Sequence, residues 1–201
     1  MFCPPFLPND LDDVPDIAKA VSAHPMMPTT EWALENNEWK NIVQGYLASV
    51  SFVDSCVGIV LDALENSPYA DNTAVVLWGD HGYSLGEKSK FAKMSLWERA
   101  TRTPLIITPP KNKVSGNPNN IVNQPVSLLD LYPTLIKICG LPENTQNQGV
   151  DISPLMQQPN LPWQHAAVTT YGPNNHAVKT TRYRYIRYAD GSEELYDHEY
   201  D

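Results

Sequence analysis

Two polar side chains near the middle of the chain could bind a cation. Asp80 and His81 follow the apolar stretch 73–78 and Gly79, and Gly82 comes next. In an α/β fold, ligands bind at the carboxyl ends of the strands. A carboxylate there is costly unless it binds a cation or accepts hydrogen bonds, and a neutral imidazole is a further metal ligand. The three residues therefore indicate a metal site. The alternative is that the aspartate caps the turn and the histidine lies on the surface, which would produce the same three-residue sequence.

Positive charges cluster directly after this turn. Five of the 14 lysines and arginines lie within fifteen residues, namely Lys88, Lys90, Lys93, Arg99 and Arg102. The whole chain has a formal charge of −9, so it lacks the broad basic face that nucleic-acid binding needs. A locally basic strip on an acidic protein suits a small anionic group. Alternatively, most of the five are solvent-exposed loop charges that Glu87 and Glu98 balance, and they bind no ligand.

A long helical pattern precedes the turn and would support it. Over 31–65, apolar residues recur every three or four positions and form one face, made of Val43, Tyr46, Leu47, Val50, Val53, Val57, Val60 and Leu64. Thr29 or Thr30 would cap this helix. Residues 1–30 are rich in proline and predict an extended segment that wraps a surface, since each proline biases its predecessor away from helix.

Two apolar stretches bracket the polar loop. Residues 73–78 and 103–108 are short and β-branched, which is typical of buried strands in a parallel sheet. A helix over 128–139 follows, with Ser127 as its cap. Pro133 falls in its second turn, so we expect a kink or a late start there.

The last third of the chain changes character. Four short stretches alternate in the manner of antiparallel strands, at 165–171, 176–181, 183–188 and 194–196. Asp190-Gly191 is a good hairpin turn between the last two. The order of elements predicts an α/β layer over 1–142 and a small antiparallel subdomain over 143–201.

Four separate blocks, in order along nearly the whole chain, resemble the sulfatase family of the alkaline-phosphatase-like superfamily, and specifically its iduronate-2-sulfatase-like members. The first block combines the Asp80-His81-Gly82 turn with residues 85–87, Lys93, 97–98 and 102–104. The others are 45–54, 125–135 and 183–197. The resemblance implies part of an alkaline-phosphatase-like sheet with flanking helices, followed by a small antiparallel β appendage.

The resemblance also implies roles for four residues. Asp80 and His81 would be two ligands of a divalent cation, usually Ca²⁺. Lys93 would bind the sulfate group and act in catalysis, because a fixed ammonium offsets the charge that develops as the S–O bond breaks. His176 would reach a hydroxyl or carboxylate of the substrate, unless it is a turn histidine hydrogen-bonded to backbone.

The family's nucleophile has no counterpart here. It is a Cys or Ser in a C/S-x-P-x-R motif, converted to formylglycine, and residues 3–7 begin like this motif but have Leu7 in place of the arginine. We expect the formylglycine and the remaining metal ligands to lie in an N-terminal half upstream of Met1. The chain would then be a C-terminal half, truncated at both ends and inactive by itself.

The sequence therefore predicts part of a sulfatase that hydrolyses sulfate esters of a carbohydrate. A phospho- or phosphonate monoester hydrolase of the same superfamily and a non-catalytic carbohydrate- or partner-binding half-domain are the alternatives. We expect no nucleic-acid partner, and no membrane partner because no apolar run reaches about 20 residues. The missing N-terminal half or a second copy would be the protein partner, and the family implies an extracytoplasmic location (periplasmic, secreted or lysosomal).

Overall fold

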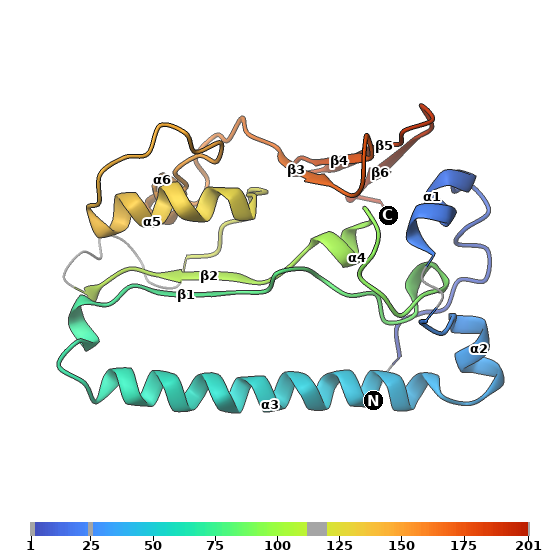
Figure 1. Cartoon of the computed structure of the whole chain (residues 1–201), viewed down its shortest axis with the longest axis horizontal. Helices are drawn as coiled ribbons and strands as arrows, with labels where there is room; N and C mark the ends of the chain where they lie inside the picture. The colour runs from blue at the N-terminus through green and yellow to red at the C-terminus, as the bar shows by residue number, and fades with distance from the viewer. Residues whose placement is uncertain (1–2, 24–25, 112–119, 201) are drawn as a thin grey trace.

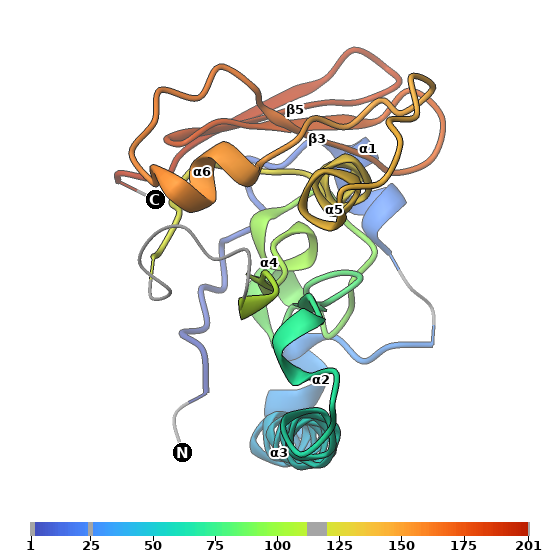
Figure 2. The ribbon, with the colours of Figure 1, turned by 90° about the vertical axis from the view of Figure 1, so that its left-hand side faces the viewer.

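The computed structural model describes residues 3–23, 26–111 and 120–200. Its elements follow in the order α1 (Asp16–Ser22), α2 (Thr30–Glu35), α3 (Trp39–Glu65), η1 (Ala70–Asn72), β1 (Val75–Trp78), η2 (Glu87–Ser89), α4 (Glu98–Thr101), β2 (Leu105–Thr108), η4 (Leu128–Asp130), α5 (Leu131–Cys139), α6 (Ser153–Gln157), β3 (Ala167–Thr170), β4 (His176–Lys179), β5 (Tyr183–Arg187) and β6 (Glu193–Asp197). Figures 1 and 2 show α3 on one side, the β1–β2 ribbon in the middle, and α5, α6 and the sheet β3–β6 on the other side. The predicted α/β class with a C-terminal antiparallel sheet is confirmed.

The N-terminal segment contains a helix that the sequence analysis missed. Helix α1 starts directly after Pro15, and Asp16 lies in its first turn. Proline is well tolerated at a helix start, because the N–H that it lacks would have no helical partner. Ala18 and Ser22 are buried on one face of α1, so packing fixes seven residues that we expected to be extended.

The single helix predicted over 31–65 is two helices. Asn37 lies between α2 and α3 with a φ of 58°, a left-handed conformation that interrupts an α-helix. The predicted cap is confirmed, since the Thr29 hydroxyl accepts a hydrogen bond from the Trp32 N–H at 3.2 Å. Helix α3 ends at Glu65, where the sequence predicts its end.

The two apolar strands pair with each other in antiparallel fashion. The register runs from Val75 opposite Thr108 to Trp78 opposite Leu105. No further strand pairs with this ribbon within the described residues. Leu77 and Trp78 are exposed, so the prediction of buried strands in a parallel sheet was wrong. The connection between the strands contains only the short turns η2 and α4, not the crossover helix that usually joins parallel strands.

The C-terminal half follows the sequence prediction closely. Ser127 and Asp130 form a reciprocal capping box at η4, and α5 begins only at Leu131, which is the late start that Pro133 predicts. Helix α5 ends at Gly140 with a φ of 69°, a conformation in which glycine has no Cβ penalty. The last four strands form one meander in the order β3-β4-β5-β6.

Two small apolar clusters hold these parts together. One joins α1 and the preceding turn to the polar loop and the C-terminal sheet, through Val14, Ala18, Leu96, Trp97, Ala177, Ile186 and Tyr188. The other joins α2 and the start of α3 to the same loop, through Ala33, Trp39, Val43 and Phe91. The loop between β1 and β2 is therefore packed from both sides.

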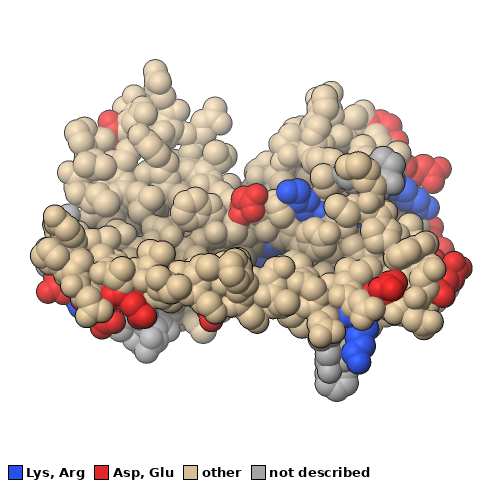
Figure 3. All heavy atoms as spheres, turned by 60° about the horizontal axis from the view of Figure 1, so that its bottom comes forward, with Lys and Arg blue, Asp and Glu red and all other residues tan. Residues whose placement is uncertain are grey.

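Helix α3 is exposed over most of its length. Only Trp39 and Val43 of its 27 residues are buried, whereas Phe52, Ile59 and Val60 are at least two-thirds exposed. Figure 3, with this side turned forward, shows a broad surface with few charged atoms. By length and composition α3 is long and apolar enough to cross a membrane, contrary to the expectation that no apolar run is long enough. Core helices of soluble proteins meet the same criterion, so this alone assigns α3 to neither class.

Candidate active site

The Asp80-His81 pair lies in a tight turn at the end of β1. The Gly79 N–H donates to the Pro104 carbonyl at 3.1 Å, and the Gly82 N–H donates to the Ala100 carbonyl at 2.8 Å. A Cβ on Gly82 would lie 2.0 Å from the Arg99 carbonyl oxygen. Only glycine allows this close approach of two backbones, so Gly82 fixes the direction in which the two preceding side chains project.

His81 and Lys93 are in direct contact. The His81 Nδ1 lies 2.8 Å from the Gly82 carbonyl oxygen, which can only accept, so Nδ1 carries the proton and Nε2 has a free lone pair. The Lys93 ammonium donates to this Nε2 at 2.8 Å. Asp80 Oδ2 lies 3.4 Å from the same Nε2. The structure thus brings together the three residues that the sequence predicts for the metal and sulfate sites.

Asp80 and His81 supply only part of a metal site. The described ranges contain no group of three or more His, Cys, Asp or Glu side chains that could hold a metal ion. A carboxylate oxygen and an unprotonated imidazole nitrogen that face the same point do suit a divalent cation. Since Ca²⁺ takes six to eight ligands, most of them would have to come from elsewhere.

The loop that leads to Lys93 is held by three residues from the N-terminal part of the chain. The Lys88 ammonium donates to Asp10 Oδ1 at 3.0 Å, and the Lys88 N–H donates to Asp10 Oδ2 at 3.1 Å. Lys90 is buried and donates to the Ser22 carbonyl at 2.6 Å, while the Ser89 hydroxyl donates to Glu31.

This loop contains two residues with an unusual backbone conformation and one buried lysine. Lys88 and Ser89 have φ values of 50° and 54°, a region that non-glycine residues rarely adopt. Burial lowers the pKa of Lys90 to about 8. The N-terminal contacts, together with the two apolar clusters, therefore hold a strained part of the loop in its conformation.

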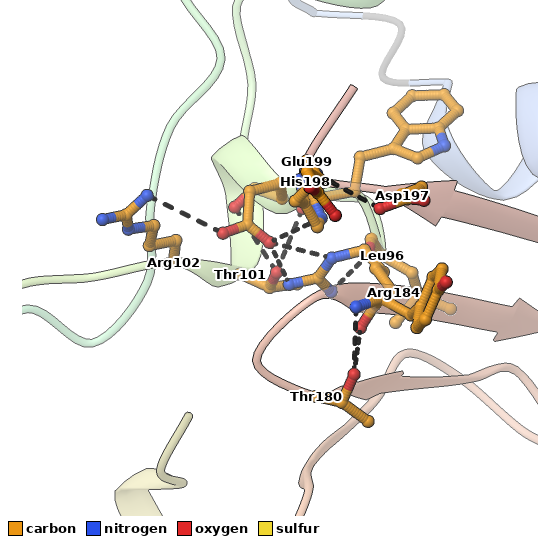
Figure 4. Close-up of polar contacts among 11 residues, drawn as sticks. Leu96, Thr101, Arg102, Thr180, Arg184, Asp197, His198 and Glu199 are labelled. Atoms are coloured by element: carbon orange, nitrogen blue, oxygen red, sulfur yellow. Dashed lines mark hydrogen bonds and ion pairs between the residues drawn. The ribbon is translucent and has the colours of Figure 1, made fainter. Parts of the chain in front are cut away.

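A buried ion pair joins α4 to the C-terminal sheet (Figure 4). The Arg184 guanidinium, only 4% exposed, donates to Glu98 Oε2 at 3.0 and 2.6 Å and to the Leu96 carbonyl at 3.0 Å. Burial alone would raise the pKa of Glu98, but the hydrogen bonds and charge of Arg184 outweigh it and hold that pKa below its usual value. Arg102 approaches Glu98 from the other side, at 4.0 Å.

A second buried carboxylate ties Trp97 to the same sheet. Glu194 accepts from the Trp97 indole N–H at 3.0 Å, from the Tyr188 hydroxyl at 2.6 Å, and from the Tyr196 hydroxyl. Burial, together with the hydrogen bonds to Glu194, raises the pKa of both tyrosines. The sequence analysis missed Arg184 and Glu194 as anchors, because their partners are close only in the folded chain.

A large groove of about 1680 Å³ opens beside the turn. Its lining includes Asp80, His81 and Lys93 at one place, and Lys179 and Arg184 at another. Strand β2, the segment 120–129, α6, β3 and residues 84–103 of the loop, with Glu87 and Glu98 among them, contribute most of the rest.

His176 is not among the residues that line this groove. It begins β4, and its Nδ1 lies 2.9 Å from the Thr170 hydroxyl. The predicted substrate contact of His176 stays a prediction.

Known proteins resemble this chain over almost all of it. The family model "Sulfatase" matches residues 12–141, and the model "N-sulphoglucosamine sulphohydrolase, C-terminal" matches residues 86–201. A sulfatase of Formosa agariphila is 50% identical over 194 residues, which is 96% of this chain and 38% of that protein. An N-acetylglucosamine-6-O-sulfatase of Bacteroides thetaiotaomicron is 32% identical over 152 residues, 73% of this chain and 27% of that protein. The chain thus spans well under half the length of these relatives.

Solved structures share the fold. A sulfatase structure from Bacteroides thetaiotaomicron covers 100% of this chain with a TM-score of 0.77 and 22% identity, over 46% of its own length. A structure in complex with its substrate D-glucosamine-2-N,6-O-disulfate has a TM-score of 0.69 and 24% identity, with 92% of this chain and 38% of that one covered. A phosphonate monoester hydrolase of Agrobacterium radiobacter has a TM-score of 0.62 and 20% identity, with 76% and 34% covered.

Proposed function

Because the chain belongs to the sulfatase family, we propose that it forms the sulfate-binding part of a sulfuric ester hydrolase that acts on a sulfated carbohydrate. The observation that carries the proposal is the Lys93 ammonium, 2.8 Å from His81 Nε2 and beside Asp80, in the lining of a groove of about 1680 Å³. A named N-acetylglucosamine-6-O-sulfatase among the relatives supports a sugar substrate.

Lys93 would hold one oxygen of the sulfate group and balance the negative charge that grows as the S–O bond breaks. His81 is already in the tautomer that leaves Nε2 unprotonated toward this point. A divalent cation, which we expect to be Ca²⁺, would neutralise the sulfate when bound, and Asp80 and His81 would be two of its ligands. Such a cation would take the Nε2 lone pair that accepts from Lys93 in this structure, so the ammonium would turn from His81 to the sulfate. Gly82 and the loop contacts at Lys88 and Lys90 keep these groups in place.

The nucleophile would be a formylglycine on polypeptide outside residues 1–201, since the sequence contains no C/S-x-P-x-R motif. We propose that this chain alone turns over no sulfate ester. The exposed face of α3 and the two-stranded β1–β2 ribbon would receive either the part of the fold that carries the nucleophile or a second copy. We propose an extracytoplasmic location on family grounds.

Titration of N-acetylglucosamine 6-sulfate into the purified chain with Ca²⁺ present tests sulfate binding. We expect Lys93→Gln to weaken binding about tenfold, the effect of losing one charge-assisted hydrogen bond. Lys137→Gln is the matched control, because Lys137 is exposed on α5 and does not line the groove. Equal affinity of wild type and Lys93→Gln would overturn the assignment of Lys93.

Turnover is a separate test of the same proposal. Sulfate release by the chain above the level of an Asp80→Ala variant would refute the proposed lack of activity. A phosphonate monoester hydrolase is the second candidate, because one shares the fold. A higher affinity for a phenylphosphonate monoester than for the sulfated sugar, lost in Lys93→Gln, would favour that candidate.

A further inference from the structure

Two positive side chains face each other across neighbouring strands of the C-terminal sheet. Lys179 of β4 is the register partner of Arg184 of β5. Directly opposite residues in an antiparallel pair lie on the same face, and like charges there destabilise the sheet. Both residues line the groove. This arrangement needs negative charge nearby to be stable.

Of the two side chains, only Arg184 forms an ion pair with a carboxylate among the described residues. Glu98 binds the Arg184 guanidinium through two hydrogen bonds. Lys179 has no carboxylate within 4.0 Å in the part of the chain that the structure describes. Its pKa is lowered, by burial first and by Arg184 and Arg102, against the attraction of Glu98. Lys179 is therefore a partly buried cation that shares the attraction of Glu98 with Arg184 and Arg102.

The same region of the groove offers a second cation and neutral polar groups. The Arg102 side chain is 79% exposed, and its guanidinium lies 4.0 Å from Glu98 Oε1, which is a long distance for an ion pair. The Thr181 hydroxyl donates to the Gln124 amide oxygen at 3.1 Å, and both residues line the groove with Thr180. Hydroxyl and amide groups beside a cation suit a carbohydrate that carries an anionic substituent.

We propose that Lys179 and Arg102 form a second anion subsite in the groove, which binds a carboxylate or a second sulfate of a multiply charged saccharide while Lys93 binds the sulfate to be hydrolysed. This inference rests on the proposed function, because it extends the same substrate. It selects for saccharides with at least two anionic groups. A bound anion would also add negative charge beside the like-charge pair between β4 and β5.

The test compares two probes by calorimetry at one fixed ionic strength, with Ca²⁺ present. One probe, N-acetylglucosamine 6-sulfate, has a single anionic group, and the other is a sulfated uronic acid–glucosamine disaccharide. We expect Lys179→Gln to weaken disaccharide binding about tenfold and to leave the monosaccharide affinity unchanged. Arg102→Gln should act in the same direction, Lys179→Arg should restore binding, and Lys137→Gln should change neither affinity.

The two proposals fail in different ways. Loss of binding of both probes in Lys93→Gln, with no change in Lys179→Gln, would overturn the second subsite and keep the sulfate site. A selective effect of Lys179→Gln supports the subsite even if Lys93→Gln is without effect. Equal weakening of both probes by Lys179→Gln, or a wild-type chain that binds the disaccharide no better than the monosaccharide, would overturn the subsite. Carboxyl-reduced and partly desulfated disaccharides then show which anion occupies it.

Discussion

Replacement of Glu98 by glutamine tests whether the buried ion pair holds the candidate site onto the C-terminal sheet. The Arg184 guanidinium is 4% exposed and directs two of its hydrogen bonds at Glu98, whose side chain is 24% exposed. Glutamine keeps the size and one oxygen acceptor but removes the charge. The guanidinium then stays buried without a countercharge, directly opposite Lys179.

The expected loss can be estimated from these contacts. Removing one partner of a fully buried ion pair costs about 3–5 kcal/mol, and one hydrogen bond to a charged group is worth about 1.5–3 kcal/mol. Since Glu98 is partly exposed and glutamine still accepts one hydrogen bond, we expect the free energy of unfolding to fall by about 2–3 kcal/mol. For a chain of this size that lowers the melting temperature by roughly 5–10 °C.

Urea denaturation followed by tryptophan fluorescence measures the change, and melting followed by circular dichroism checks it. Glu143→Gln removes the same charge from an exposed loop residue and should change stability by less than about 0.5 kcal/mol. Because the folded-state pKa of Glu98 lies below its unfolded value, its contribution is present above the unfolded pKa and is lost as the pH falls through the folded pKa. Glu98→Gln should therefore flatten the acid limb of the stability profile. A stability within 0.5 kcal/mol of wild type, or an unchanged acid limb, would refute the reasoning.

Three further changes have defined outcomes. Gly82→Ala should lower the free energy of unfolding by about 3 kcal/mol and abolish sulfate binding, because its Cβ would lie 2.0 Å from the Arg99 carbonyl oxygen. The control Gly58→Ala adds a Cβ on α3 with no atom within 4 Å and should raise that free energy by about 1 kcal/mol in the same urea assay. The pKa of Lys90 is about 8, below the unfolded value of about 10.4, so the unfolded state binds more protons between these values and stability should rise with pH there. That rise should be absent in Lys90→Met. Above about pH 10 the stability of both proteins should fall with pH, because the pKa values of Tyr188 and Tyr196 are raised in the folded state. Glutamate at Phe52, Ile59 and Val60 should remove concentration-dependent association in sedimentation velocity, and association that persists would show that α3 is not the contact surface.

Glu98, Glu194 and Asp10 share one structural consequence. Each binds a residue in or beside the loop between β1 and β2 to a segment that is distant in the sequence. The loop itself has only short helical turns, but backbone hydrogen bonds cross it, such as those from the Gly82 N–H to the Ala100 carbonyl and from the Ser84 N–H to the Ala92 carbonyl. The buried charges therefore add to these backbone bonds in positioning Lys93.

Local features of this protein could be predicted from the sequence because they depend on neighbouring residues. The Thr29 cap, the late start of α5 after Pro133, and the four-strand meander follow from side-chain hydrogen bonding, proline geometry and period-two alternation. The resemblance to sulfatases indicated Asp80, His81 and Lys93 as candidate site residues, and the structure places their side chains close together.

Only the tertiary structure decided how these features combine. The apolar stripe of α3 predicts a buried face, but periodicity shows only that one face is apolar and cannot show what covers it. Apolar composition likewise could not tell a buried parallel strand from the exposed antiparallel ribbon of β1 and β2. Arg184 meets Glu98, and Lys179 meets Arg184, across sequence distances over which no local pattern extends. Burial and charge pairing arise from chain segments that meet only on folding, and these contacts define the groove and its second cluster of positive charge.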